Sequence, residues 1–248
     1  MKTGKNNRSF IITLTGIICT LFLSCEKKEE FPKVYGTVTD RDGIIYNTVS
    51  IGPQVWMTEN LRTTHFNDGT PILYLAEDSS WSSNTQLTYY GYCWYDNDSS
   101  NRGKYGALYK ITLATSGLLC PDGWHIPTNS EWDDLTTYLG GDLVAGGKLK
   151  DSSTIYWKSP NVGATDESSF TALPGGYRDG DGTFSGIGDS GFWFSSSIYH
   201  SSSVMQESHN SLLRWGYRLG FDNDEFIVDT YNTINSPGFS VRCIKDRN

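Results

Sequence analysis

Apolar and polar residues alternate at the start of the folded region and predict a β-hairpin. Residues 34–39 follow the two-residue period of a strand, and residues 44–51 continue in strand-forming residue types. Between them, Asp40-Arg41-Asp42-Gly43 carries turn chemistry. The same four residues could begin a calcium loop, but the remaining ligand positions of an EF-hand do not follow. We therefore expect a hairpin here.

The clearest local prediction is a helix over residues 128–140. Thr128 and Glu131 have the spacing of a capping box, in which each side chain accepts a hydrogen bond from the other residue's backbone amide. The apolar Trp132, Leu135 and Leu139 fall on one face of this helix. Gly140 provides the stop signal. We expect this amphipathic helix to pack on a sheet.

The remainder of the chain reads as short strands separated by turns. Residues 62–100 show no period, and we expect an irregular segment held by partly buried aromatic rings: Trp81, Tyr89, Tyr90, Trp94 and Tyr95. Glycine-rich turns follow residue 146 and alternate with strand-like runs at 170–174, 191–196, 214–219 and 238–244. No fixed-period repeat is present. The pattern predicts an α+β fold, with a loop-rich, mostly antiparallel sheet and one or two helices.

The N-terminal residues have the pattern of an export signal. Lys2, Lys5 and Arg8 precede a short apolar run at residues 10–23, which ends at Ser24-Cys25. A bilayer-spanning helix needs about 20 apolar residues, so an uncleaved anchor helix is the weaker alternative. We therefore divide the chain into a signal peptide (1–24), an anchor and linker (25–33) and one domain (34–248).

Residues 21–25 resemble the lipobox of bacterial lipoproteins, in which the cysteine receives the lipid. This resemblance implies acylation of Cys25 by chains such as palmitate, which would hold the protein at a membrane without a spanning helix. Lys28-Glu29-Glu30 resembles the charged tag that directs lipoproteins to the surface of Bacteroidetes-like bacteria, although a solvated linker explains the same residues. The implied location is the outer membrane or cell surface.

Charge excludes two classes of partner. The chain has 20 basic and 28 acidic residues, and removing residues 1–24 leaves 17 basic and 28 acidic residues, a formal net charge of −11. Nucleic-acid binding requires a basic stripe, and adsorption to anionic membranes requires clusters of Lys and Arg. Neither pattern is present, so we expect no nucleic acid and contact with a membrane through the lipid anchor alone.

Several short segments can be compared with known families as a set: in order along the chain, they are 42–43, 49–61, 120–128, 131–132 and 238–243. This set resembles the Fibrobacter succinogenes major paralogous domain, common in lipoproteins of Bacteroidetes-like bacteria. The helix start and the closing Gly-Phe-Ser-Val-Arg also resemble C-type lectin-like and formylglycine-generating-enzyme folds. The lectin-like resemblance implies a disulfide between Cys120 and Cys243. Cys93 is then left over, as a buried apolar residue.

No catalytic constellation is evident. Gly188-Asp189-Ser190-Gly191 matches the letters around a trypsin-like nucleophile, but neither His65 nor His125 lies in the motif that such an enzyme needs. A formylglycine-generating-type oxidase needs a reactive cysteine pair late in the domain, where only Cys243 lies. We therefore expect a protein that is not an enzyme, with the oxidase as the weakest alternative.

Two groups of residues remain as candidate binding sites. Oxygen ligands on loops suit calcium and predict a possible calcium site at Asp179, Asp181, Asp222 and Asp224. The loop aromatics suit stacking on sugar rings or a protein interface, and predict a binding surface at Trp193, Tyr199, Trp215 and Tyr217. Our first hypothesis is a non-catalytic module that binds glycan or an envelope protein. The alternative is a structural envelope component without a soluble ligand.

Overall fold

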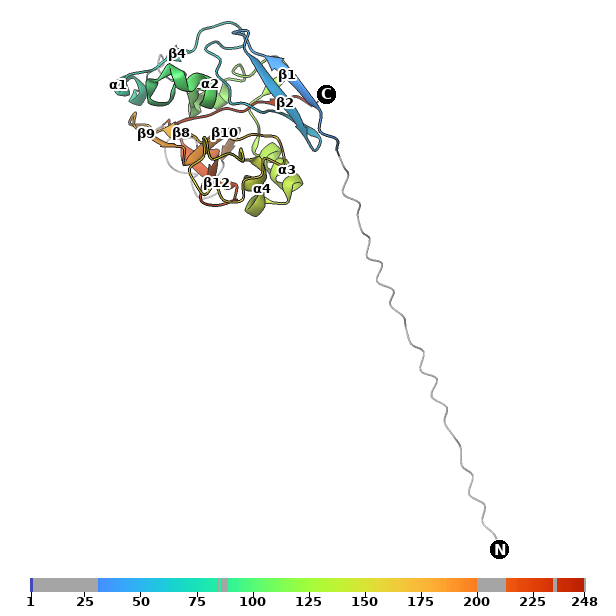
Figure 1. Cartoon of the computed structure of the whole chain (residues 1–248). Helices are drawn as coiled ribbons and strands as arrows, with labels where there is room; N and C mark the ends of the chain where they lie inside the picture. The colour runs from blue at the N-terminus through green and yellow to red at the C-terminus, as the bar shows by residue number, and fades with distance from the viewer. Residues whose placement is uncertain (2–30, 84, 86–88, 200–212, 234–235, 248) are drawn as a thin grey trace. The chain divides into compact units, whose positions relative to one another are not determined.

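The computed structural model describes Met1 and residues 31–247, apart from residues 84, 86–88, 200–212 and 234–235. The chain divides into two units, Met1–Glu30 and Phe31–Asn248, and the described helices and strands lie in the second. That unit has the α+β class predicted from the sequence (Figure 1). Cys25 and the charged tag at 28–30 lie outside the described residues.

Two sheets, largely antiparallel, form the framework. The five-stranded sheet has the order β1 (Tyr35–Thr39), β2 (Ile45–Ile51), β3 (Gln54–Met57), β14 (Ile244–Lys245) and β7 (Trp124–His125). The nine-stranded sheet has the order β12 (Ile227–Asn232), β11 (Leu213–Gly220), β10 (Ser190–Tyr199), β8 (Gly175–Arg178), β13 (Gly238–Phe239), β6 (Leu108–Lys110), β5 (Gly91–Cys93) and β4 (Leu73–Tyr74), with β9 (Phe184–Ile187) paired to β8. Only the β8–β10 and β4–β5 pairings of these described strands are parallel.

The predicted hairpin is formed by β1 and β2. Asp40 closes its turn, because its Oδ1 accepts hydrogen bonds from the amides of Asp42 and Ile44, both at 2.9 Å. Gly43 has a φ of +78°, in the left-handed region that glycine adopts without strain. The other carboxylate oxygen of Asp40 accepts a 2.6 Å hydrogen bond from the hydroxyl of Tyr46. The turn is therefore fixed by the residues that predicted it.

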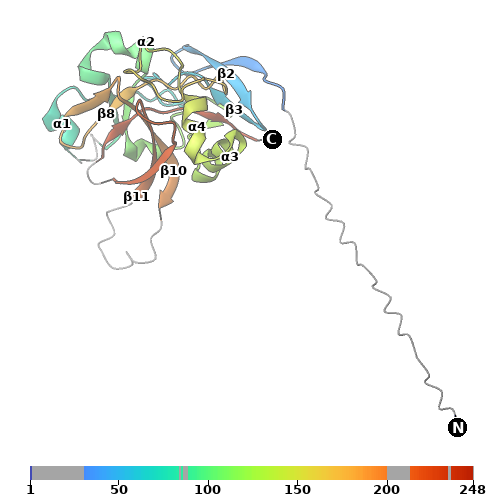
Figure 2. The ribbon, with the colours of Figure 1, turned by 60° about the horizontal axis from the view of Figure 1, so that its bottom comes forward.

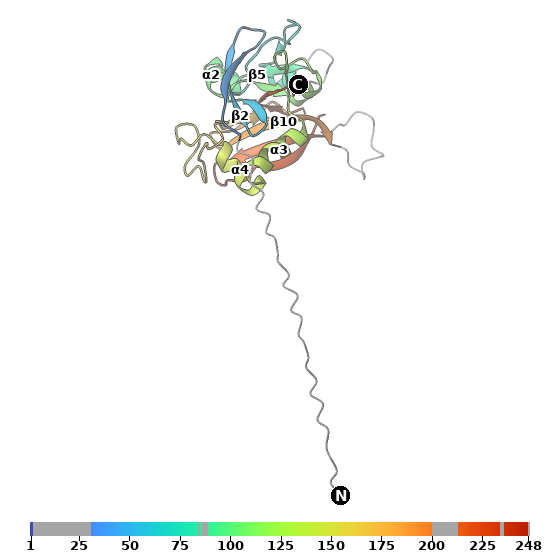
Figure 3. The same ribbon diagram turned by 90° about the vertical axis from the view of Figure 1, so that its right-hand side faces the viewer.

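The predicted helix is α3 (Asn129–Leu139), and its capping box is confirmed. The amide of Glu131 donates to Oγ1 of Thr128 at 3.3 Å, and the amide of Thr128 donates to Oε2 of Glu131 at 2.9 Å. Trp132, Leu135 and Leu139 are buried, and Gly140 ends the helix in the left-handed conformation. In Figures 2 and 3 this helix lies beside α4 (Asp142–Leu149) and next to β10.

The glycines at 146 and 147 were predicted to open a turn-rich region, and this is wrong because they lie inside α4. A Cβ on Gly146 would overlap the carbonyl of Glu225, and one on Gly147 would overlap the carbonyl of Gly163. The two glycines therefore allow two loops to lie against the helix. The remaining described helical segments are short: α1 (Asp78–Ser82), α2 (Arg102–Tyr105) and the 3₁₀ turns at Tyr95–Asn97, Ser99–Asn101 and Ile111–Thr115.

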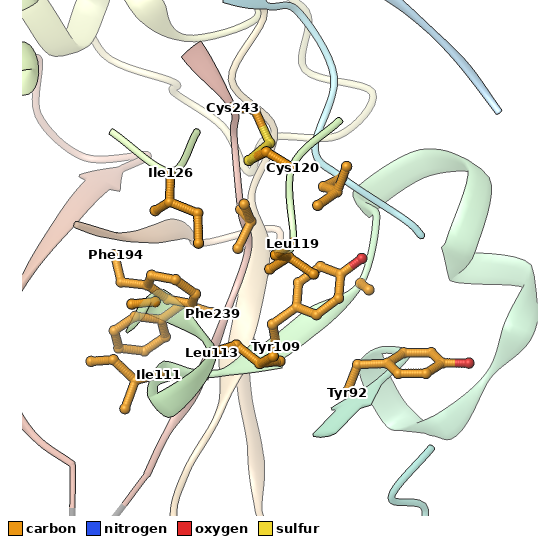
Figure 4. Packing of buried hydrophobic residues seen from close by; sticks show 14 of the residues in the cluster. Tyr92, Tyr109, Ile111, Leu113, Leu119, Cys120, Ile126, Phe194, Phe239 and Cys243 are labelled. Carbon is orange, nitrogen blue, oxygen red and sulfur yellow. A yellow bond between two sulfur atoms is a disulfide. The ribbon is translucent and has the colours of Figure 1, made fainter. Parts of the chain in front are cut away.

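Three buried clusters fill the interior. The largest joins the two sheets around Tyr109, Phe194 and Phe239 and includes the disulfide (Figure 4). The second packs Trp132 of α3 against Trp56 and other rings. The third holds Trp81, Cys93 and Tyr95. Trp81, Trp94 and Tyr95 are buried, as expected for the rings of the irregular segment, whereas Tyr89 and Tyr90 stand at the surface.

The disulfide joins Cys120 to Cys243, as the resemblance implied. The two cysteines are 123 residues apart in the sequence: Cys120 follows the irregular segment, and Cys243 directly precedes β14. Cys93 is the free cysteine of the described chain and is buried. Its burial raises the pKa of the thiol to about 12, so the thiol stays protonated at neutral pH. Cys93 therefore behaves as a small interior side chain.

The closing segment was predicted as one strand over 238–244, and the structure divides it between both sheets. Gly238–Phe239 pairs with β6 and β8, and Ile244–Lys245 pairs with β3 and β7. Between them, the guanidinium of Arg242 is buried, lies 4.1 Å from the ring centroid of Phe170 and donates to Oδ1 of Asn60 at 3.0 Å. This segment therefore ties the two sheets together.

Candidate functional site

A hollow of about 520 Å³ opens on one face of the nine-stranded sheet, where β12, β11, β10, β8 and β13 lie in succession. Three of these strands, β8, β10 and β11, are labelled in Figure 2. Its volume falls within the usual range of small-molecule sites, about 300–1,000 Å³. It is lined by Tyr177, Asp179, Phe192, Arg218, Asp229, Thr230, Tyr231, Asn232, Pro237 and Phe239.

Aromatic rings form the floor and walls of this hollow. Phe192 of β10 and Phe239 of β13 stack with their centroids 5.3 Å apart. Tyr177 lies 4.8 Å from Phe192, and Tyr231 lies 4.7 Å from Phe239, edge to face. The two phenylalanines are nearly buried, whereas both tyrosines are half-buried and border the open space. The hollow therefore combines an apolar floor with phenolic walls.

A glycine on β11 makes room for one of these walls. Gly216 pairs with Asp229 of β12, and the ring of Tyr231 lies across its backbone. A Cβ at this position would overlap Cδ2 and Cε2 of Tyr231 and come within 3.3 Å of Phe239. Any other residue at 216 would displace the tyrosine ring, so the shape of the hollow depends on this glycine.

Charged side chains stand beside the rings. Arg218 pairs directly with Phe192 across β10 and β11, so both side chains project from the same face of the sheet. Asp229 is a diagonal neighbour of Arg218, and Asp179 reaches the rim from the turn after β8. Both aspartates are exposed, while Arg218 is half-buried. The guanidinium of Arg218 is therefore less exposed to solvent than the two carboxylates are.

Several polar groups in the hollow have no partner within the described chain. The side chain of Arg218 forms neither a hydrogen bond nor an ion pair with any described residue, although Asp229 is close in register. The hydroxyls of Tyr177 and Tyr231 likewise have no hydrogen-bond partner among the described residues. Burial, and then the charge of Asp229, raises the pKa of Tyr231 to about 12, while Arg218 lowers it. At neutral pH the hydroxyl is protonated and can donate.

Residues 49–245 match the family described as the Fibrobacter succinogenes major domain. The chain belongs to this family. The match covers more than half of the chain and includes the strands of the hollow, whereas β1 lies before it. No curated protein and no solved structure matches the chain. Membership of this family does not by itself indicate an activity, so function has to be argued from the site.

The aromatic surface predicted from the sequence of this Fibrobacter succinogenes major domain needs correction at two positions. Trp193 and Tyr217 are each 1% exposed, because they are cross-strand partners on the face of β10 and β11 that α3 covers. Tyr217 lies 4.9 Å from Trp132, and Nε1 of Trp193 donates to Oδ1 of Asn60 at 3.0 Å. Both are therefore interior residues and cannot contact a ligand from the surface.

The other two predicted aromatics stay partly accessible. Tyr199 and Trp215 form an edge-to-face pair with centroids 4.8 Å apart, at the far end of β10 and β11. They do not line the hollow. Strand alternation offered a signal for the hollow, because a buried Trp193 places its neighbour Phe192 on the opposite face. The sequence could not tell which of the two faces the helix covers.

The structure does not bring the four predicted calcium ligands together. The described residues contain no group of three or more His, Cys, Asp and Glu side chains placed to hold a metal. Asp179 and Asp181 belong to the turn between β8 and β9, where Oδ1 of Asp181 accepts a 2.9 Å hydrogen bond from the amide of Thr183. Asp222 and Asp224 lie in the loop after β11. Asp179 and Asp181 therefore belong to a different loop from Asp222 and Asp224.

A buried lysine, Lys150, lies beside the loop that contains Asp222 and Asp224. The ammonium of Lys150 is buried and donates to the carbonyl oxygens of Val162, Gly220 and Asn223 at 2.8, 2.9 and 2.7 Å. Burial lowers the pKa of this ammonium to about 8, while nearby Asp224 and Asp222 raise it. The ammonium of Lys150 therefore binds the backbone beside two of the four predicted calcium ligands, Asp222 and Asp224.

One further charged cluster holds the end of the domain. His125 lies between two carboxylates, with Nε2 2.9 Å from Oε2 of Glu131 and Nδ1 2.6 Å from Oδ1 of Asp246. Glu131 also closes the capping box of α3. The cluster connects the helix start to residues after β14, and we assign it a structural role.

None of the helices in the described residues is long and apolar enough to cross a membrane.

Proposed function

We propose that this chain is a non-catalytic binding module, held at the bacterial outer membrane or cell surface by a lipid on Cys25, that binds a glycan in the aromatic hollow. The observation that carries the proposal is the combination of aromatic rings with partnerless polar groups in one open hollow. Tyr177 and Tyr231 supply ring surface, and Arg218 supplies free hydrogen-bond donors. These half-buried donors and acceptors border the open space of the hollow, so they are available to a ligand there.

The chemistry of the hollow suits sugars. A pyranose ring presents an apolar C–H face, which packs against aromatic rings, and a polar edge of hydroxyls that require hydrogen bonds. Phe192 and Tyr231 supply the first kind of surface. Asp179 and Asp229 supply carboxylate acceptors on the rim. Nucleic acid is a poor alternative, because the chain has a formal net charge of −8.

The proposed lipid anchor is based on the sequence of residues 1–25. Lys2, Lys5 and Arg8, the apolar run at 10–23 and Cys25 follow the order of a lipoprotein signal. Mass spectrometry of the protein purified from the membrane fraction is expected to show an N-terminal Cys25 that carries acyl chains. An N-terminus at Met1, or an unmodified Cys25, would contradict the anchor and leave the glycan site to be tested separately.

The binding site is tested with the full chain, purified in detergent, on an array of oligosaccharides. The variant Tyr177→Ala/Tyr231→Ala removes both walls of the hollow and is expected to lower affinity by at least about tenfold, as loss of anchor residues does at other interfaces. The matched control is Tyr199→Ala/Trp215→Ala, which removes the partly accessible aromatic pair outside the hollow and is expected to bind as the parent protein does.

Two results would contradict this assignment. Equal losses in both double variants, or a loss only at Tyr199 and Trp215, would move the site to the end of β10 and β11. Failure of the parent protein to bind any oligosaccharide, together with its recovery in a stable envelope complex, would favour a structural component instead. Capture of one envelope protein through the same hollow would favour a protein partner.

A further inference from the structure

The position of Arg218 indicates more about the ligand than the aromatic rings do. Its Cα pairs with that of Phe192 on one side and with that of Ile227 on the other. Along β11, the ring of Tyr231 covers the neighbouring Gly216. Arg218 therefore stands between Phe192 and Ile227, is half-buried, and is the one basic side chain among the described residues that line the hollow.

The charge of this guanidinium is not used within the described chain. The nearest carboxylates of the lining are Asp229 and Asp179, and neither lies within 4.0 Å as an ion pair. Several other arginines and lysines of the described domain have assigned partners; Arg178, for example, donates to the carboxylate of Asp78 at 2.7 Å and to the carbonyl of Leu75 at 2.6 Å. A half-buried, partnerless arginine in an open hollow is available to a ligand anion.

We propose that the glycan bound by this hollow carries a carboxylate, as in a uronic acid, and that Arg218 binds this carboxylate through two parallel hydrogen bonds. This inference rests on the proposed function and names its ligand class. A guanidinium presents its donors as a planar fork that matches the two oxygens of a carboxylate. The sugar ring then lies over Phe192 and between Tyr177 and Tyr231.

The two aspartates that line the hollow favour a carboxylate over a phosphate as the group that Arg218 binds. Asp179 and Asp229 both line the hollow that contains Arg218. A phosphate monoester carries nearly two negative charges at neutral pH, and both would face these carboxylates. A carboxylate carries one charge and is compensated by Arg218 alone. The aspartates remain free to accept hydrogen bonds from the hydroxyls of the same sugar.

The experiment compares matched ligands on the full chain. The probes are oligosaccharides of galacturonate, glucuronate and mannuronate, each beside its carboxyl-reduced counterpart, in which a primary alcohol replaces the acid. A phosphorylated mannose oligosaccharide is the third kind of probe, beside the uronates and their reduced counterparts. The parent protein is expected to prefer at least one uronate over its reduced counterpart by about tenfold or more, which corresponds to one charge-assisted pair. Raising the salt concentration is expected to reduce this preference.

Variants of Arg218 connect the preference to this side chain. Arg218→Gln is expected to lower affinity for the uronate to that for its carboxyl-reduced counterpart, so that the preference for the acid is lost. Arg218→Lys keeps the charge but not the fork, so it is expected to retain only part of the preference. The control Arg102→Gln removes an arginine that lies over Trp94, outside the hollow, and is expected to leave the preference intact. Thermal melts of all variants identify any loss that reflects unfolding.

Each contrary result has a separate meaning. Equal binding of acid and reduced sugars would overturn this inference and leave the glycan module standing. A preference that persists in Arg218→Gln would overturn the role of Arg218. Tighter binding of the phosphorylated sugar than of every uronate would overturn the choice of carboxylate. Binding of no oligosaccharide by the parent protein would overturn both the inference and the proposed function.

Discussion

The ring of Tyr231 lies across the backbone of Gly216 on the neighbouring strand, in space that a Cβ would occupy. This contact sets the width of the hollow between β11 and β13, because the same ring also meets Phe239 edge to face. A backbone position without a side chain thus determines where an aromatic wall of the candidate site stands.

Replacing Gly216 by Ala is expected to displace Tyr231 and narrow the hollow. Glycan affinity should fall by about tenfold, and the free energy of unfolding should fall by about 1–3 kcal/mol, as for other overpacked positions. Urea denaturation and glycan titration measure the two effects. Gly103→Ala is the control, because a Cβ there meets nothing within 4 Å. Unchanged binding in Gly216→Ala would show that Tyr231 does not shape the site.

Replacing Lys150 by Met is expected to destabilise the fold by at least about 2 kcal/mol, because it removes the buried ammonium that donates to three backbone carbonyl oxygens. Urea denaturation measures the change. Lys158→Met is the control, because that ammonium is 61% exposed and pairs with Asp189 at the surface. Added calcium is expected to leave the unfolding midpoint of the parent protein unchanged. A calcium-dependent midpoint would mean that the loop of Asp222 and Asp224 does bind the ion.

The pair of His125 and Glu131 predicts a pH dependence of stability. Hydrogen bonding to Glu131, and then to Asp246, raises the pKa of His125 above 6.5 despite its burial. Burial alone would raise the pKa of Glu131, but hydrogen bonds from His125 and Thr128 lower it below 4.5. The histidine contribution is complete below pH 6.5 and is lost as pH rises through its folded pKa. The glutamate contribution is present above pH 4.5 and is lost as pH falls through its folded pKa.

His125→Gln is therefore expected to be most destabilising between pH 4.5 and 6.5 and least destabilising well above that window. The pair is partly solvated, so the difference should be about 1 kcal/mol or less. Urea denaturation of parent and variant at a series of pH values measures it. A difference that is constant with pH would mean that His125 contributes packing alone.

The disulfide is expected to be a major source of stability. Replacing both Cys120 and Cys243 by Ala should lower the free energy of unfolding by about 4–5 kcal/mol in the chain-entropy model, because the bond closes a long loop. Thermal and urea denaturation measure the change, and reduction of the parent protein should reproduce it. Cys93→Ala, which leaves the bond intact, serves as the control. A fall of less than about 1 kcal/mol in the double variant would contradict this account.

Local elements of this fold were predictable because their causes are local. The Asp40 turn and the capping box of Thr128 and Glu131 are each formed by residues within a few positions of one another. Helix α4 was not predictable in this way. Gly146 and Gly147 look like turn residues, and the reason for them is the carbonyls of Glu225 and Gly163, distant in the sequence, that lie against the helix.

The sequence did not locate the hollow. Of the four aromatic residues predicted to bind a ligand, Trp193 and Tyr217 are interior, and none of the four lines the hollow. The walls of the hollow come from strands that are far apart in the chain, at Tyr177 and Tyr231. Which face of the sheet α3 covers depends on the packing of Trp132 against Tyr217, which the period of the strands does not encode.

The segment from Gly238 to Lys245 has a consequence for the order of folding. It supplies a strand to each sheet and carries the cysteine that locks the middle of the chain. The nine-stranded sheet cannot be completed until residue 239 has left the ribosome, nor the five-stranded sheet until residue 245 has, and contacts this distant in sequence form slowly. Closure of both sheets and of the disulfide therefore has to wait until almost the whole domain has been synthesised.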